Sequence, residues 1–201
     1  MKIGIVIQAR SASTRLSGKV LKKLPFSSDT CVLQQVIRRA KLAKKVNLVT
    51  VATTTDPEDD AIIDVCQKES VSWFRGSRDN VLERYYLAAK ENQLDTVVRI
   101  TSDCPCLDPA VVDYVIERYL AGNVDYLTNA IERTFPHASD VEVFSFAALE
   151  KAFHSARTTQ EKEHVTLFMY QSRPDLFRVA ALPAPPQWYA SDIRLTLDTV
   201  E

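Results

Sequence analysis

The sequence predicts an α/β protein with a mostly parallel sheet between two layers of helices. Short apolar runs rich in β-branched residues alternate along the chain with longer segments whose apolar residues recur at helical spacing. Strands that alternate with helices form right-handed crossover units, which place helices on both faces of a parallel sheet. With 201 residues, of which 46% are hydrophobic, the chain can bury one sizeable core. We therefore expect a single principal domain over residues 1–201.

The first elements of this pattern are the clearest. Residues 2–9 form a continuous apolar run, typical of a strand that is covered on both faces. Residues 31–45 have helical spacing, with Asp29 or Thr30 available as the N-cap. A second helix is expected after Asp56, where a proline and three acidic residues suit a helix N-terminus. The alternation continues with strands expected at 47–53, 71–74 and 95–101 and helices at 56–69, 80–92 and 109–122.

The last third of the chain is less regular. Its apolar and β-branched residues predict further strands, and two amphipathic stretches predict helices. A proline-rich loop, PAPPQW, separates the last two of these strands. The strands are expected at 124–129, 140–146, 177–182 and 193–199, and the helices at 146–156 and 159–171.

Composition excludes several classes of function. A net charge of −1 offers no basic excess with which to hold a nucleic-acid backbone. No apolar run approaches the roughly 18 residues that span a bilayer, and the N-terminal run is too short for a signal peptide. We therefore expect a cytoplasmic protein with no membrane and no nucleic-acid partner. The four cysteines suit that compartment as free thiols, and for Cys104-Pro105-Cys106 packing is favoured over a metal or redox pair.

A cationic loop follows the first strand. Arg10, Arg15 and Lys19 lie within ten positions, and because like charges repel, their grouping indicates an anion between them. Only four glycines occur in the chain, and their spacing matches neither the glycine-rich dinucleotide-binding fingerprint nor the P-loop motif. A phosphate would therefore be gripped by side chains. The hydroxyl residues that could add donors are Ser11, Ser13 and Thr14. The alternative is a solvated loop, but the carboxyl end of a first strand is the favoured ligand position in such sheets.

Two aspartates each follow an apolar strand. Asp103 comes after VVRITS, and Asp198 comes after RLTL. Carboxylates at such positions can hold Mg²⁺ together with water and substrate phosphates. Either residue alone would more often be a helix cap or an Asx turn. As a pair beside a phosphate loop, they favour a metal site.

Seven segments together resemble the CMP-sugar synthetases, the cytidylyltransferases that activate Kdo and sialic acids. The segments occur in the order IQARSASTRLSGKVL, VATTTDPEDDAI, FRGSRDNVLERYY, VVRITSDCPCLDP, RTFPHASDVEVFSF, EHVTLFMY and RLTLDTVE. They cover nearly the whole chain, and the resemblance is greatest to the branch of spore-coat polysaccharide biosynthesis protein F. The helix that follows the final D-T-x-E motif in this family is missing from these 201 residues.

The resemblance implies a fold and a reaction. The fold is a three-layer, Rossmann-like nucleotidyltransferase sheet with a small extension for dimerisation or the sugar pocket, placed at residues 131–172. The reaction is Mg²⁺-dependent: CTP and an acidic or phosphorylated sugar give CMP-sugar and pyrophosphate, for surface polysaccharide or glycan biosynthesis. A homodimer is also implied.

The resemblance further implies roles for individual residues. The triphosphate would be held by Arg10, Ser11, Ser13, Arg15 and Lys19, with Arg10, Lys19 and Asp103 as the catalytic set. The base would face Gly76 and Ser77, with Arg75 and Arg84 reaching base or sugar. The metal ligands would be Asp103 and Asp198, and the sugar would meet Arg84, Asp140, Glu142 and His164. For His164, a structural role as a helix-capping or surface histidine is as well supported as contact with the sugar.

Two other functions remain as alternatives. A nucleotide-sugar glycosyltransferase shares the sheet and the metal, but it would ordinarily carry Asp-x-Asp where this chain has Asp103-Cys104-Pro105. A non-catalytic homologue would keep the fold alone, although the intact cationic and acidic positions argue against it. The chain departs from the family at Ser17, Asn80 and the Ala138-Ser139 pair. The last two lie near the expected base and sugar sites, so the sequence does not name the sugar.

Overall fold

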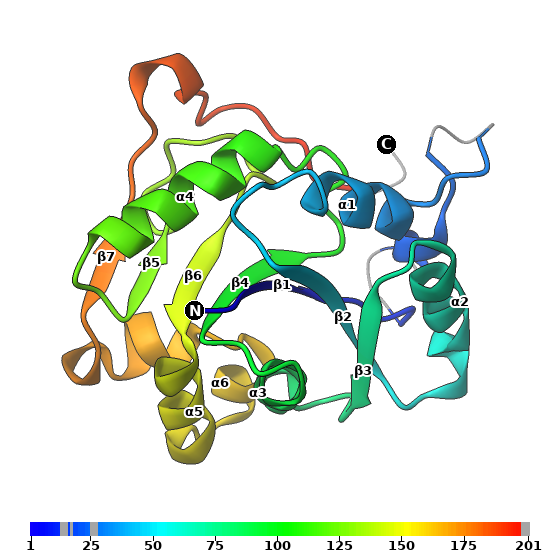
Figure 1. The fold of residues 1–201 in the computed structure, drawn as a ribbon, viewed down its shortest axis with the longest axis horizontal. Coiled ribbons are helices and arrows are strands. Elements are labelled where there is room, and N and C mark those ends of the chain that lie inside the picture. Colours follow the sequence, from blue (N-terminus) through cyan, green and yellow to red (C-terminus); the bar gives the residue numbers. More distant parts are fainter. Residues whose placement is uncertain (13–15, 17, 25–27, 198–201) are drawn as a thin grey trace.

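The computed structural model describes residues 1–12, 16, 18–24 and 28–197. A sheet of seven strands, in the order β3-β2-β1-β4-β6-β5-β7, runs through the molecule with helices on both of its faces (Figure 1). The predicted α/β class with a mostly parallel sheet is therefore confirmed.

The first half of the chain builds the parallel part of the sheet. Strand β1 lies between β2 and β4, and β2 pairs with β3 on its other side. The crossover helices between these strands leave β1 and β4 adjacent, at the point where the strand order reverses. The elements are β1 (Ile3–Gln8), α1 (Val32–Ala40), β2 (Leu48–Thr54), α2 (Asp60–Lys68), β3 (Ser72–Gly76), α3 (Val81–Glu91), β4 (Thr96–Thr101) and α4 (Pro109–Ala121).

Both faces of β1 are buried, as its continuous apolar run predicts. Ile5 and Ile7 pack into one cluster with residues of α1, α2 and α4. Val6 points the other way, into a second cluster with α3 and α5 (Phe146–Ser155). Alternate strand residues face opposite sides, so each layer of helices receives its own core.

The last third of the chain extends this sheet. Strand β6 (Glu142–Ser145) is antiparallel to β4 and to β5 (Tyr126–Thr128), and β7 (Val179–Ala181) pairs in parallel with β5. Residues 131–172 therefore contribute β6, a strand with neighbours on both sides, together with α5 and α6 (Thr159–Glu163). Short 3₁₀ turns occur at Lys19–Leu21, Pro57–Asp59, Pro174–Leu176 and Pro186–Trp188, and a π-helical turn at Phe168–Ser172.

The helix expected over 159–171 was wrong in extent. Thr158 and Glu161 form a reciprocal capping box that starts α6, but the helix ends at Glu163. Val165 has a φ of 50°, a left-handed conformation that a β-branched residue adopts only under constraint. Val165 and Thr166 are buried, and the Thr166 hydroxyl donates to Glu142. Tertiary contacts therefore break the helical periodicity at this point.

Two smaller expectations were also wrong. The residue that caps α1 is Cys31, in a box with Gln34, and not Asp29 or Thr30. The Asp29 carboxylate pairs with Lys23, and the Thr30 hydroxyl accepts from Arg38. Within the described part of 193–199 there is no strand, only a single bridge between Arg194 and His137. That segment lies beside a loop rather than beside a strand, so it finds no ladder to join.

None of the helices in the described ranges is long and apolar enough to cross a lipid bilayer.

Candidate active site

A polar cavity of about 310 Å³ opens at the carboxyl ends of β1 and β4. This is the reversal point of the strand order, where ligands bind in open α/β sheets. The charged and polar side chains of its wall come from the ends of four elements and from the 10–19 loop. They are Gln8, Arg10, Lys19, Arg84, Arg99, Thr101, Ser102, Asp103, Glu163 and His164.

Lys19 and Asp103 meet inside this cavity. Lys19 Nζ lies 2.7 Å from Asp103 Oδ2, and both side chains are largely shielded from solvent. Gly18 precedes Lys19 with a φ of 64°, a left-handed turn that favours glycine and that starts the 3₁₀ turn carrying the lysine. Burial alone would raise the pKa of the Asp103 carboxyl, but hydrogen bonds from Lys19 and Thr101 outweigh it and lower the pKa. Asp103 is therefore kept ionised, and the cationic loop and the end of β4 meet in this cavity.

A buried aspartate anchors the base of the cationic loop. Asp59, only 2% exposed, accepts the Ser11 backbone N–H at 2.6 Å and the hydroxyls of Thr53 and Thr54. Gly18 N–H closes the loop by donating to the Ser11 carbonyl at 3.0 Å. The Ser11 hydroxyl donates to the Glu58 carbonyl, so in this conformation it is directed at the protein. The loop that carries Arg10 and Lys19 is thus tied to the end of β2.

We expect Asp59→Ala to destabilise the protein by about 1–3 kcal/mol, because three donors lose a buried acceptor. Burial alone would raise the pKa of Asp59, but its hydrogen bonds from Thr54, Ser11 and Thr53 lower it below the ordinary value. A carboxyl with a depressed folded-state pKa stabilises the fold above its unfolded pKa of about 4, and loses that contribution as pH falls through the folded pKa. Urea unfolding from pH 7 to pH 3 should therefore show the difference between wild type and Asp59→Ala shrinking. Asp64→Ala, at an exposed position of α2, is the control; a pH-independent difference would contradict the assignment.

Arg84 is a buried cation without an acidic partner in the described part of the chain. Its side chain is 1% exposed, and Nη1 donates to the carbonyls of Ser77 and Arg78. Its buried Nε has no hydrogen-bond partner there. Burial and, after it, the charge of Arg10 lower the pKa of Arg84. A guanidinium held in a cavity wall under these conditions is suited to bind an anionic ligand group.

Arg10 and His164 complete the rim of the cavity. Arg10 Nη2 lies 3.9 Å from Glu163 Oε1, and both side chains are partly exposed, so this ion pair is weak. His164 follows directly on the end of α6 and lines the cavity. Both residues therefore line the same cavity as Lys19 and Asp103.

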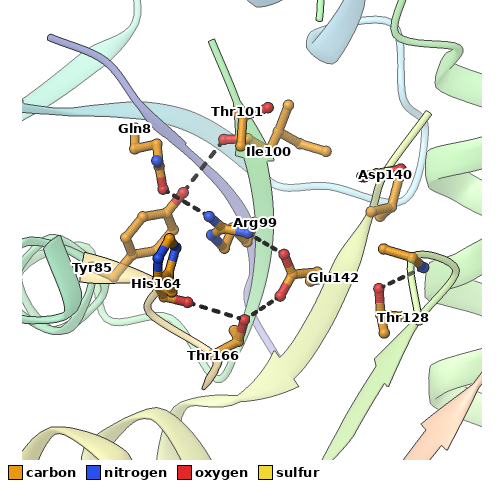
Figure 2. A network of polar contacts seen from close by, with 12 residues as sticks. Gln8, Tyr85, Arg99, Ile100, Thr101, Thr128, Asp140, Glu142, His164 and Thr166 are labelled. Carbon is orange, nitrogen blue, oxygen red and sulfur yellow. Dashed lines mark hydrogen bonds and ion pairs between the residues drawn. The ribbon is translucent and has the colours of Figure 1, made fainter. Parts of the chain in front are cut away.

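Glu142 lies behind the cavity, in a buried network (Figure 2). Its carboxylate accepts from Arg99, from the Tyr126 hydroxyl at 2.9 Å and from the Thr166 hydroxyl. Burial alone would lower the pKa of Arg99, but the charge of Glu142 outweighs it and raises the pKa. Of the residues assigned to the sugar, Glu142 is thus one step removed from the cavity, behind Arg99.

The remaining predicted residues are not brought to the cavity wall. The Arg75 guanidinium is engaged locally, with the Thr54 and Asp56 carbonyls and the Asp60 carboxylate. Gly76 and Ser77 lie at the end of β3, where Ser77 accepts from Arg84 through its carbonyl. Asp140 pairs with Arg133.

The assignments of Ser13, Arg15 and Asp198 fall outside the described residues. Leu197, the residue before Asp198, donates its backbone N–H to the Asp103 carbonyl at 3.1 Å. The C-terminal segment thus returns to the end of β4. Over the described ranges, no cluster of three or more His, Cys, Asp or Glu side chains could hold a metal ion.

Three residues of this region went unnoticed in the sequence. Gln8 ends the first strand and lines the cavity, Arg99 lines it from β4, and Asp59 holds the loop. A charge inside the apolar run VVRIT could have indicated Arg99, because a buried cation needs a partner. Nothing in the local pattern distinguishes Asp59 from its acidic neighbours.

A family model for cytidylyltransferases matches residues 4–195. The chain belongs to the cytidylyltransferase family. Among curated relatives, the spore coat polysaccharide biosynthesis protein SpsF of Bacillus subtilis is 33% identical over 197 residues, covering 98% of this chain and 81% of that protein. A 3-deoxy-manno-octulosonate cytidylyltransferase of Solibacter usitatus is 28% identical over 204 residues, covering 92% of this chain and 77% of that protein.

A solved cytidylyltransferase has nearly the same fold. The cytidylyltransferase from Leptospira borgpetersenii superposes with a TM-score of 0.92 at 36% identity, covering 100% of this chain and 83% of that chain. The resemblance drawn from the seven sequence segments is therefore confirmed at the level of the family.

Proposed function

We propose that this cytidylyltransferase moves the cytidylyl group of CTP to an acidic or phosphorylated sugar for surface polysaccharide or glycan biosynthesis. A sugar oxygen forms a bond to the α-phosphorus while the bond to the β-phosphate oxygen breaks, and pyrophosphate leaves. The sugar hydroxyl releases its proton to solvent. The observation that carries the proposal is the Lys19–Asp103 pair in a cavity at the ends of β1 and β4.

The residues of the cavity suit this reaction. Phosphoryl-type transfer depends on holding the reacting oxygens in line and on neutralising the charge of the leaving group. Lys19 and Arg10 would bind the triphosphate, and the chain holds both on one short loop beside the cavity. Arg84 would take the carboxylate or phosphate of the sugar, because its buried guanidinium has no carboxylate of its own in the described chain. The relatives named for a polysaccharide and for an acidic sugar support this substrate class.

Mg²⁺ is part of the proposal. Asp103, kept ionised in the cavity, fits a metal that takes one or two carboxylates and completes its shell with water and phosphates. Asp103 and Asp198 would hold the ion, which when bound would neutralise charge on the triphosphate. Cytoplasmic location and a homodimer stay predictions of the sequence.

Pyrophosphate release from each of the four nucleoside triphosphates, with a panel of acidic sugars and sugar phosphates, tests the proposal. We expect release with CTP and at least one such sugar. Release only with another nucleotide would overturn the choice of base. Binding of CTP without turnover of any sugar would favour the non-catalytic alternative, and transfer of a sugar from a nucleotide-sugar would favour the glycosyltransferase.

We expect Arg84→Met to lower kcat/KM for the sugar by about 10- to 100-fold, the usual value of a hydrogen bond to a charged group. The free energy of unfolding should change by less than about 1 kcal/mol, because the substitution also removes a buried charge. Steady-state kinetics and urea unfolding measure the two effects. Arg118→Met, on α4, is the matched control. Equal losses of activity in both variants would contradict the assignment of Arg84.

A further inference from the structure

A chain of hydrogen bonds leads from the core to the cavity wall (Figure 2). It begins at Glu142, which is 7% exposed and is held by three donors. It continues through Arg99, which donates from Nη2 to Gln8 Oε1 at 3.2 Å. Gln8 and Arg99 line the cavity, whereas Glu142 does not. The network therefore ends on the side-chain amide of Gln8.

This chain sets the orientation of the Gln8 amide. A guanidinium has donors only, so it must meet the amide oxygen and not the amide nitrogen. The opposite orientation would place N–H groups against N–H groups. Gln8 Nε2 is thereby turned away from Arg99, and it makes no hydrogen bond to any residue in the described ranges. Two fixed N–H donors are therefore available to a ligand.

The positive charge of Arg99 is neutralised within the protein. Glu142 forms an ion pair with Arg99, so this part of the wall carries no net charge. Arg84, in contrast, has no carboxylate partner in the part of the chain described. Gln8 is thus suited to an uncharged oxygen, and Arg84 to a charged one.

The network reaches the cavity from β4 and β6, whereas the anchor of the cationic loop lies on the other side of β1. The loop that carries Arg10 and Lys19 is tied to Asp59, on the β2 side of β1. Glu142 and Arg99 belong to β6 and β4, on the other side of β1. Gln8, on β1, therefore lies between the anchor of the loop and the Arg99–Glu142 pair.

We infer that Gln8 determines sugar specificity by donating a hydrogen bond to an uncharged hydroxyl or carbonyl oxygen of the sugar. Arg99 and Glu142 are positioning residues that hold the Gln8 amide in its donating orientation. This inference rests on the proposed transfer to a sugar, and it adds a residue that recognises an uncharged oxygen of that sugar.

The test uses CTP and whichever sugar of the panel supports pyrophosphate release. Gln8→Glu keeps an oxygen for Arg99 but replaces both donors with an acceptor. We expect it to lower kcat/KM for the sugar by about tenfold or more, since a site built to bind an oxygen through a hydrogen bond is left mismatched. The KM for CTP should stay within about twofold of wild type. Gln67→Glu, on the exposed side of α2, makes the same chemical change away from the cavity and is the control.

Glu142→Gln tests the positioning step. It leaves Arg99 less firmly held, so it should raise the sugar KM while leaving the KM for CTP within about twofold, measured at a temperature where the variant is folded. A merely structural role would lower the active fraction and leave both KM values unchanged. Monodeoxy analogues of the sugar should identify the oxygen: for one analogue, wild type and Gln8→Leu should have the same kcat/KM.

Several outcomes would overturn the inference. If Gln8→Glu and Gln8→Leu both keep kcat/KM for the sugar within about twofold of wild type, Gln8 does not contribute to sugar specificity. The transferase proposal would still stand in that case. An equal rise in the KM values for CTP and sugar would assign Gln8 to the nucleotide. Failure of every sugar with the wild-type protein would instead remove the proposed function, and this inference with it.

Discussion

Lys19→Ala should lower kcat by about 10²- to 10³-fold, the usual effect of losing one preorganised electrostatic group. The side chain projects into the cavity from a 3₁₀ turn that Gly18 starts, and it pairs with Asp103 at 2.7 Å. Without it, charge that develops on the departing pyrophosphate would lack a fixed cation. Single-turnover pyrophosphate release with saturating CTP and sugar measures the effect on the chemical step.

Lys22→Ala is the matched control for this variant. Lys22 follows the same turn but is exposed and does not line the cavity. Its activity should stay close to that of wild type. Full activity in Lys19→Ala, or an equal loss in the two variants, would show that the Lys19–Asp103 pair is not the centre of the reaction.

Glu142→Ala should destabilise the fold by about 3–5 kcal/mol, because it leaves the Arg99 charge buried without its partner. The carboxylate also accepts from Tyr126 and Thr166, so the substitution removes an acceptor from two further buried groups. Burial and the nearby charge of Glu142 raise the pKa of the Tyr126 hydroxyl, which therefore stays protonated and donates. Urea unfolding at neutral pH measures the loss.

Two comparisons separate this effect from a general sensitivity of the fold. Glu91→Ala removes an exposed carboxylate at the end of α3 and should change stability by no more than about 0.5 kcal/mol. The double variant Arg99→Met/Glu142→Leu replaces both charges with apolar side chains and should recover much of the lost stability. A double variant as unstable as Glu142→Ala would mean that packing at β6, and not the unpaired charge, is the cause.

Most of the first two thirds of the fold could be predicted from the sequence. The apolar run around Val6 and the proline and acidic residues after Asp56 are local signals, and the elements that form there agree with the local pattern. The break at Val165 could not be predicted, because the buried contact of Thr166 with Glu142 joins residues 24 positions apart. The cap of α1 also differs from the expectation, because the helix begins after Cys31 and not after Asp29 or Thr30.

The candidate site divides in the same way. Lys19 and Asp103 are recognisable in the chain because their residue types and their positions after strands already suggest a phosphate and a metal. Their distance of 2.7 Å, across 84 positions, exists only because β1 and β4 are neighbours in the sheet.

The local residue pattern was therefore sufficient to predict the fold class, the family and the cationic loop, because each of these depends on short segments of the chain. The folded arrangement alone decides that Asp59 anchors the loop, that Glu142 lies behind the cavity wall and that Gln8 turns its amide nitrogen away from Arg99. The physical reason is that each of these roles depends on a hydrogen bond between residues at least 43 positions apart, with a partner that no local pattern identifies.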